Sequence, residues 1–209
     1  MVNMLADTIA DIAKAVSASR YLERLLAAKP TLANDVAALL KTPVTRAELS
    51  DWLSSRQATP LLSEADLKPL LREFKQWAYA RIATRDLANL ASLAEVMETM
   101  TCIAELAISQ AIGVLMQGLV ERYGVPRNAE GLAQSLIVIG MGKLGGRELN
   151  VSSDIDLIFV YPDDGDTDAM SPTTGNETRS ISNSEFFTRL GRGLINAIAD
   201  TRRTDKSFG

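Results

Sequence analysis

The sequence contains no histidine and a single cysteine, Cys102, among its 209 residues. The absence of histidine excludes Ser-His-Asp and Cys-His catalytic arrangements within the chain, and it excludes histidine metal sites. Any metal ion would be held mainly by oxygen ligands, which favours Mg²⁺, Mn²⁺ or Ca²⁺. One cysteine cannot form an internal disulfide, so a reducing, cytoplasmic setting is the simplest interpretation.

The chain also lacks a strong excess of charge of either sign. It has 22 basic and 26 acidic residues, a net charge of −4, which offers no bulk electrostatic case for binding nucleic acid or an anionic membrane. The longest apolar stretches are expected to fall short of a membrane span, and the N-terminus lacks a signal pattern. With 46% hydrophobic and 23% charged residues, the composition is that of a globular protein.

The first part of the chain predicts one helix after another, because its apolar residues recur at a spacing of about 3.6. Thr45 with Glu48 and Ser92 with Glu95 have the spacing of capping boxes, in which each side chain bonds the other residue's backbone N–H. The last of these helices is expected near 93–123, followed by a glycine and then a proline.

The composition then changes from helical to mixed. A β-branched run at 135–139 predicts a buried strand, and a glycine-rich turn follows at 140–146. A second strand is predicted at 154–161. The polar segment 162–182 is expected to be a mobile loop, and Ser184 to open a final helix.

Two carboxylates, Asp154 and Asp156, stand at the start of the second predicted strand. Residues i and i+2 of a strand point to the same face, so both side chains are expected side by side. Two negative charges this close repel, and a divalent cation such as Mg²⁺ would stabilise them. In isolation an Asp-x-Asp pair is more often a turn cap or a solvated strand start, so the preceding turn must decide.

That turn contains Lys143 and four glycines, at 140, 142, 145 and 146. Such turns expose backbone N–H groups that suit an anion, and lysine adds a positive charge for a phosphate. The glycines literally match the dinucleotide-binding fingerprint, but 146–153 is too short for the helix that this fold needs before its second strand. A P-loop is excluded because Leu144, rather than Ser or Thr, follows the lysine.

A glycine turn, a short helix and a strand with Asp-x-Asp together resemble the DNA polymerase beta-like nucleotidyltransferases. Within that superfamily, the segment Gly142-Lys-Leu-Gly-Gly-Arg-Glu-Leu-Asn-Val-Ser-Ser-Asp-Ile-Asp-Leu-Ile-Phe159 closely resembles the bifunctional glutamine synthetase adenylyltransferase/adenylyl-removing enzymes. The upstream segment Arg81-Ile-Ala-Thr-Arg-Asp-Leu87 is similar to the same family. The resemblance thus covers most of the chain.

The resemblance implies an α+β fold in two parts. A helical N-terminal region at 1–128 would precede a nucleotidyltransferase core at 129–209 with a small mixed sheet, incomplete at its C-terminus. Family members carry a third carboxylate on a later strand, which is expected beyond Gly209. The chain thus resembles an N-terminal fragment, and losing one of three metal ligands would lower the rate on the order of 10³-fold or more.

The resemblance also implies a reaction and its residues. The family has two nucleotidyltransferase copies, and this chain resembles the N-terminal one, which removes AMP from a tyrosine of glutamine synthetase by phosphorolysis. Asp154 and Asp156 would be catalytic and would bind Mg²⁺, with Mn²⁺ as an alternative. Contacts to an adenine nucleotide (ATP or ADP) or to phosphate would come from Gly142, Lys143, Gly145, Gly146 and Ser153.

Glutamine synthetase is the implied protein substrate, and a PII-type signalling protein is the implied regulatory partner. Two alternatives stay open: a non-catalytic fragment that binds a nucleotide or a partner, and a nucleotidyltransferase with another acceptor. Outside the site, Arg81 and Arg85 are expected on a solvated face or as a link to the catalytic domain, and Arg147 is expected to form a surface pair with Glu148.

Overall fold

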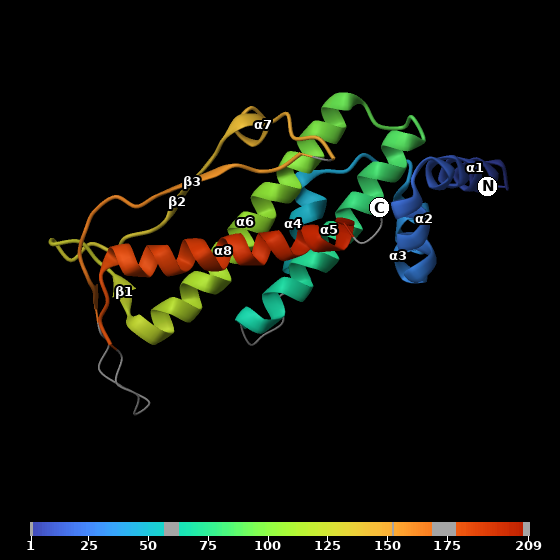
Figure 1. Cartoon of the computed structure of the whole chain (residues 1–209). Helices are drawn as coiled ribbons and strands as arrows, with labels where there is room; N and C mark the ends of the chain where they lie inside the picture. The colour runs from blue at the N-terminus through green and yellow to red at the C-terminus, as the bar shows by residue number, and fades with distance from the viewer. Residues whose placement is uncertain (1, 57–62, 152, 169–178, 207–209) are drawn as a thin grey trace.

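The computed structural model describes residues 2–56, 63–151, 153–168 and 179–206. Helices occupy the first part of the chain, as the apolar spacing predicts (Figure 1). They are α1 (Val2–Ala18), α2 (Arg20–Ala28), α3 (Pro30–Leu39), α4 (Arg46–Ser54), α5 (Glu64–Leu87) and α6 (Leu93–Tyr123).

The helix starts follow the sequence signals, but the two predicted capping boxes do not close. Thr45 and Ser92 each accept a hydrogen bond from the backbone N–H three residues later, as predicted. The side chains of Glu48 and Glu95, however, bind buried arginines instead of returning to the caps. Where an arginine has been removed from water, its charge is a stronger partner for the carboxylate than an exposed N–H.

The C-terminal helix α8 (Asn183–Lys206) lies across the long helices α5 and α6 (Figure 1). It begins one residue before the predicted Ser184 and continues to Lys206, beyond the expected apolar pattern. Gly191 allows α8 to approach the strand Leu157–Val160 closely, because a Cβ at residue 191 would lie 3.2 Å from the Phe159 ring. The helix therefore supports the strand that directly follows the predicted aspartates.

Two small sheets complete the described fold, both antiparallel. Strand β1 (Val125–Pro126) pairs with β4 (Thr167–Asp168), and β2 (Ile137–Gly140) pairs with β3 (Leu157–Val160). The short helix α7 (Gly142–Gly145) is the turn between β2 and β3. The α+β class is confirmed, while the described pairings are antiparallel rather than mixed. Antiparallel pairing also excludes the dinucleotide fold, whose strands are parallel.

The expectation of a wholly mobile loop at 162–182 is wrong for its described residues. Strand β4 lies inside this segment, and Asp166 forms an isolated bridge with Ser182. Thr167 is buried, and its hydroxyl accepts a hydrogen bond from the Ile181 N–H at 3.0 Å. Side-chain and backbone partners from β1 and the start of α8 hold these residues in place. The middle of the loop, 169–178, lies outside the described residues.

One hydrophobic cluster joins both parts of the chain. Buried apolar side chains from α1 through α6 are continuous with those of α8, including Phe186, Leu190 and Leu194. Strands β2 and β3 rest on this cluster through half-buried side chains such as Val138 and Phe159. The division of the chain into two domains near residue 128 stays a prediction. The hydrophobic core is continuous across that point and marks no boundary there.

Helix α6 contradicts the expectation that no apolar stretch could span a membrane. Its 31 residues include an 18-residue window of mean hydropathy 1.6, so it is long and apolar enough by length and composition alone. The core helix of a soluble protein passes the same test, and α6 packs against α4, α5 and α8. One third (33%) of the window is buried by this packing.

Candidate functional site

The two predicted aspartates lie in the extended segment that leads into β3. Exposure alternates along it: Asp154 and Asp156 are exposed, whereas Ile155, Leu157 and Phe159 are half-buried against the hydrophobic cluster. This is the period of two that an extended chain imposes when one face is buried. Both carboxylates are therefore on the solvent side of the segment, as the spacing predicts.

Asp156 also lies beside the glycine turn. Its backbone carbonyl accepts a hydrogen bond from the Met141 N–H at 2.9 Å, which extends the β2–β3 pairing by one step. A Cβ placed on Gly142 would lie 4.0 Å from Oδ2 of Asp156, and Gly142 has a φ of +54°, in the left-handed region. A glycine here thus gives the turn its conformation while the carboxylate lies next to it.

Lys143 and Ser153 come together across the mouth of the same turn. The Lys143 ammonium donates to Oγ of Ser153 at 3.3 Å, and the Ser153 hydroxyl donates to Oδ1 of Asn150 at 2.5 Å. The Asn150 N–H in turn donates to Oγ of Ser153 at 3.3 Å. Two residues predicted to contact phosphate are therefore neighbours, one in the glycine turn and one directly before Asp154.

Gly145 and Gly146 serve the turn itself. Their N–H groups donate to the carbonyls of Met141 (3.3 Å) and Gly142 (2.9 Å). A Cβ on Gly145 would lie 2.5 Å from the Gly140 carbonyl oxygen, so this position needs glycine for close backbone packing. By helix geometry, the amides of 142–144 have no carbonyl partner within α7, and these are the better-placed donors for an anion.

Arg147 does not pair with Glu148, contrary to expectation. Its guanidinium donates to Glu98 at 2.6 and 3.1 Å and to Glu105 at 2.8 Å, two carboxylates about two turns apart on one face of α6. These bonds and the two negative charges raise the pKa of Arg147 above its ordinary value. Sequence reasoning missed this contact, because nothing in the spacing places residue 147 near residue 98.

Arg81 and Arg85 are buried, with side chains 1% and 3% exposed, so the expectation of a solvated face is wrong. Arg81 donates to Glu48 at 2.5 Å and to the Thr42 carbonyl at 3.2 Å. Arg85 binds both oxygens of Glu95, at 2.7 and 2.9 Å. Burial lowers the pKa of Arg81 below its ordinary value. These arginines connect helices, and among the described residues none of their hydrogen-bond partners belongs to the glycine turn.

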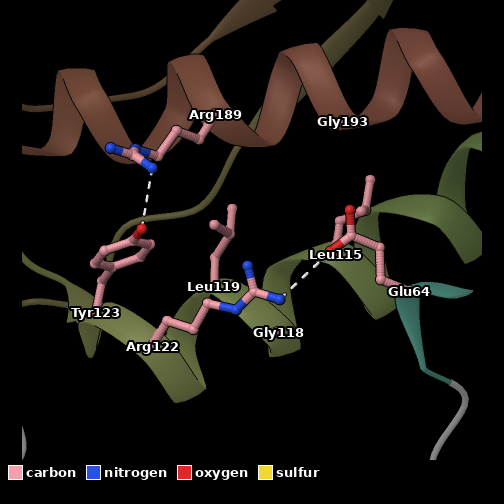
Figure 2. Close-up of a pocket in the computed structure, with 8 residues that line it drawn as sticks. All are labelled: Glu64, Leu115, Gly118, Leu119, Arg122, Tyr123, Arg189 and Gly193. Atoms are coloured by element: carbon pink, nitrogen blue, oxygen red, sulfur yellow. Dashed lines mark hydrogen bonds and ion pairs between the residues drawn. The ribbon is translucent and has the colours of Figure 1, made fainter. Parts of the chain in front are cut away.

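A pocket of about 180 Å³ lies between α6 and α8 (Figure 2). Its apolar side is formed by Leu115 and Leu119, and Arg122, Tyr123 and Arg189 stand around it. The Arg189 guanidinium donates to the Tyr123 hydroxyl at 3.0 Å. None of the residues predicted for catalysis or nucleotide binding lines this pocket.

The donor set beside the glycine turn fits a hard divalent cation. Two exposed carboxylates emerge on one side of an extended segment, and Oδ2 of Asp156 lies next to Gly142 of the glycine turn. Mg²⁺ is held by one or two carboxylates and completes its shell with water and phosphate oxygens. Among the described residues, no group of three or more Cys, Asp or Glu side chains is placed to hold a metal ion.

A glycine turn beside an Asp-x-Asp segment in an α+β fold is consistent with a nucleotidyltransferase core. Comparison with known families is more specific. The family model for glutamate-ammonia ligase adenylyltransferase matches residues 9–206, and the chain belongs to this family.

Curated relatives agree with the family model. The chain is 48% identical over 194 residues to a protein of Aromatoleum aromaticum, covering 93% of this chain and 19% of the relative. It is 50% identical over 188 residues to one of Burkholderia mallei (88% and 20%) and 41% identical over 210 residues to one of Chromobacterium violaceum (98% and 22%). Each is named bifunctional glutamine synthetase adenylyltransferase/adenylyl-removing enzyme. The chain spans about a fifth of these relatives' length.

Proposed function

We propose that this chain carries a magnesium-dependent nucleotidyl-transfer site that removes AMP from an adenylylated tyrosine of glutamine synthetase. The observation that carries the proposal is the position of the Asp156 carboxylate beside Gly142, with Asp154 on the same side of the chain. The substrate comes from the names of the relatives, which include both the adenylylating and the adenylyl-removing activity.

In this reaction an oxygen of inorganic phosphate forms a bond to the phosphorus of adenylyl-tyrosine. The bond from phosphorus to the tyrosyl oxygen breaks, and the products are ADP and the free tyrosine side chain. Asp154 and Asp156 bind the metal, and Lys143 with the Ser153 hydroxyl contacts phosphate oxygens. The glycine turn (Gly142, Gly145 and Gly146) lets the backbone approach the phosphates closely.

Magnesium, when bound, neutralises charge on the phosphoryl oxygens and orients the entering and leaving groups. The residues present fit that ion, because both ligands are carboxylates of exposed residues. Mn²⁺ has similar oxygen preferences and is the expected substitute. The nucleotide ligand is adenine-based, ATP or ADP, by the family's chemistry.

The adenylyl-removing direction rests on the resemblance of the Ser153-Asp-Ile-Asp156 segment, with the preceding Ser152, to the N-terminal copy of the family. Ser152 lies outside the described residues. A cytoplasmic location, a PII-type partner and the absence of nucleic-acid and membrane binding belong to the same proposal. The absence of histidine supports a metal site built from oxygen ligands. The single cysteine cannot form an internal disulfide, which supports the cytoplasmic location.

The metal assignment is tested by calorimetric titration of ADP and ATP into the 209-residue chain with and without Mg²⁺. We expect Mg²⁺-dependent binding that Asp154→Asn and Asp156→Asn each weaken by about tenfold or more, because each removes one charged ligand. Asp51→Asn, on the exposed side of α4, changes the net charge equally and should leave binding unchanged. Equal binding by the wild type and both site variants would refute the assignment.

The direction of the reaction needs a separate assay. Adenylylated glutamine synthetase with phosphate should yield ADP only slowly, on the order of 10³-fold or more below the rate of a site with three metal-binding carboxylates, whereas unmodified glutamine synthetase with ATP should yield no pyrophosphate. Pyrophosphate release without ADP release would assign the adenylylating activity instead. Metal-dependent nucleotide binding with neither product would favour a non-catalytic nucleotide-binding role.

A further inference from the structure

We infer that Arg147 is a positioning residue, which holds the glycine turn on helix α6 so that the turn faces Asp156. The inference rests on the proposed function, because the turn is proposed to bind phosphate. It names a residue and an anchor, Glu98 with Glu105, that lie outside the predicted site. The three side chains are called the clamp below.

The contacts of the clamp join two parts of the chain that are far apart in sequence. Arg147 follows directly on the last glycine of the turn, and its guanidinium reaches both oxygens of Glu98 and one of Glu105. A forked guanidinium–carboxylate contact fixes orientation as well as distance, which a single lysine contact would not do. The turn is thereby held to a helix whose other face is buried in the hydrophobic cluster.

The backbone of Arg147 gives an independent reason. Its φ is +57°, in the left-handed region, where a side chain is unfavourable and glycine is the usual residue. Glycines occupy the two preceding positions, yet a long charged residue stands at this one. A strained conformation is retained where the surrounding contacts determine it, and such positions concentrate at functional sites.

The clamp is suited to positioning more than to stability. Arg147, Glu98 and Glu105 have side chains 46%, 54% and 30% exposed, and exposed ion pairs contribute little to the free energy of unfolding. The stability of the turn comes instead from Leu144 and Leu149, which are buried on either side of Arg147. Removing the clamp should therefore loosen the turn without unfolding the protein.

Arg147→Gly is the first test, because glycine keeps the left-handed backbone and removes only the side chain. We expect the amides of 142–148 to exchange hydrogen for deuterium at least several-fold faster. The dissociation constant for Mg²⁺–ADP should rise about 10- to 100-fold, the usual effect of removing a residue that orients the groups in contact with a metal. The melting temperature should change little.

The second test removes the negative charges of the clamp on α6 instead of the arginine. Glu98→Gln with Glu105→Gln leaves Arg147 and the turn unaltered, and should reproduce both effects. Combined with Arg147→Gly it should add nothing further, since the three side chains act as one unit. Arg46→Gln is the matched control: Arg46 also pairs with Glu105, but it starts α4 and does not touch the turn. It should leave exchange in the turn and nucleotide affinity unchanged.

The two readouts separate this inference from the proposed function. Unchanged exchange of 142–148 in Arg147→Gly and in the double glutamine variant would overturn the clamp, whatever the nucleotide affinity. If the wild-type chain binds no Mg²⁺–ADP, the proposed site fails, and the exchange data alone decide whether Arg147 holds the turn. Faster exchange with weaker nucleotide binding, in both variants but not in the control, would establish the inference.

Discussion

Arg85 shows how a single side chain can connect several elements in the interior. Besides Glu95, it donates to the backbone carbonyls of Leu40 at 2.7 Å and Leu90 at 3.0 Å. Both carbonyls stand at or near helix ends, where no further turn of helix supplies an N–H. The guanidinium thus satisfies these acceptors, and Glu95 balances its charge. This buried cation is tolerated because each of its three nitrogens donates at least one hydrogen bond and Glu95 supplies the opposite charge.

The Arg85–Glu95 pair predicts acid sensitivity. Burial alone would raise the pKa of Glu95, but hydrogen bonds from Arg85 and the Val44 N–H, with the nearby positive charges, leave that pKa below its ordinary value. A depressed carboxyl pKa stabilises the fold above the unfolded pKa of about 4.3, and this contribution is lost as the pH falls through the folded pKa.

Glu95→Gln should therefore cost about 3 kcal/mol in the free energy of unfolding at pH 7, because Arg85 is left buried without its counter-charge. The difference from wild type should shrink as the pH falls below the unfolded pKa of about 4.3 and through the lowered folded pKa of Glu95. Urea unfolding across pH 3–7 measures both. Glu185→Gln, which removes an exposed partner of Arg189, should stay within error. A pH-independent difference would contradict the linkage.

At the scale of elements, the end of α6 determines where the small sheets begin. Gly124 ends the helix with a φ of +84°, and its N–H still donates to the Val120 carbonyl at 2.9 Å. A Cβ there would lie 1.7 Å from the carbonyl oxygen of Asp168 in β4. The end of the helix and the β1–β4 pairing therefore both depend on residue 124 being a glycine, which has no Cβ.

Gly124→Ala should destabilise the protein, by about 1–2 kcal/mol for the left-handed conformation and about 1–3 kcal/mol more for the overlap with β4. Gly113→Ala is the opposite case in the same helix, since a Cβ there has no neighbour within 4 Å. It should stabilise by about 0.5–1 kcal/mol. Thermal unfolding followed by circular dichroism measures both, and equal melting temperatures would contradict the argument.

At the scale of the whole molecule, the solvent side of β2 and β3 is unusually apolar. Two cross-strand pairs, Ile137 with Val160 and Ile139 with Ile158, each leave 41–47% of the side chain exposed. Among the described residues, no third strand pairs with β2 or β3. Exposed apolar side chains beside unpaired strand edges favour edge-to-edge association.

We expect the chain to self-associate as its concentration rises, and Ile139→Thr with Ile158→Thr to reduce this, because threonine keeps the strand preference and lowers hydrophobicity. Sedimentation velocity over a concentration series measures the change. Val138→Thr, on the inner side of the same strand, should instead lower the melting temperature. Unaltered sedimentation in the double variant would show that this face does not drive association.

The local geometry around the candidate site could be predicted largely from the sequence because its parts are local, whereas the roles of its residues stay predictions. Asp154 and Asp156 share a face because side chains alternate along an extended chain. Gly142 and Lys143 lie in the connection between the paired strands β2 and β3, just before the same segment. The sequence could not show that Gly145 and Gly146 use their N–H groups within the turn, whereas Gly142 lies beside Asp156. Which amide is used inside a turn depends on backbone torsion angles, and four nearby glycines leave these open.

The sequence by itself determined the helices, their starts and the α+β class, since apolar spacing and capping residues act over a few residues. Only the tertiary structure decided the partners of the charged side chains. Arg81 and Arg85 are buried, and Arg147 reaches α6, because folding brings carboxylates from positions 10 to 49 residues away within hydrogen-bond distance. Charge carries no periodic signal, and its partner is set by packing across the whole chain.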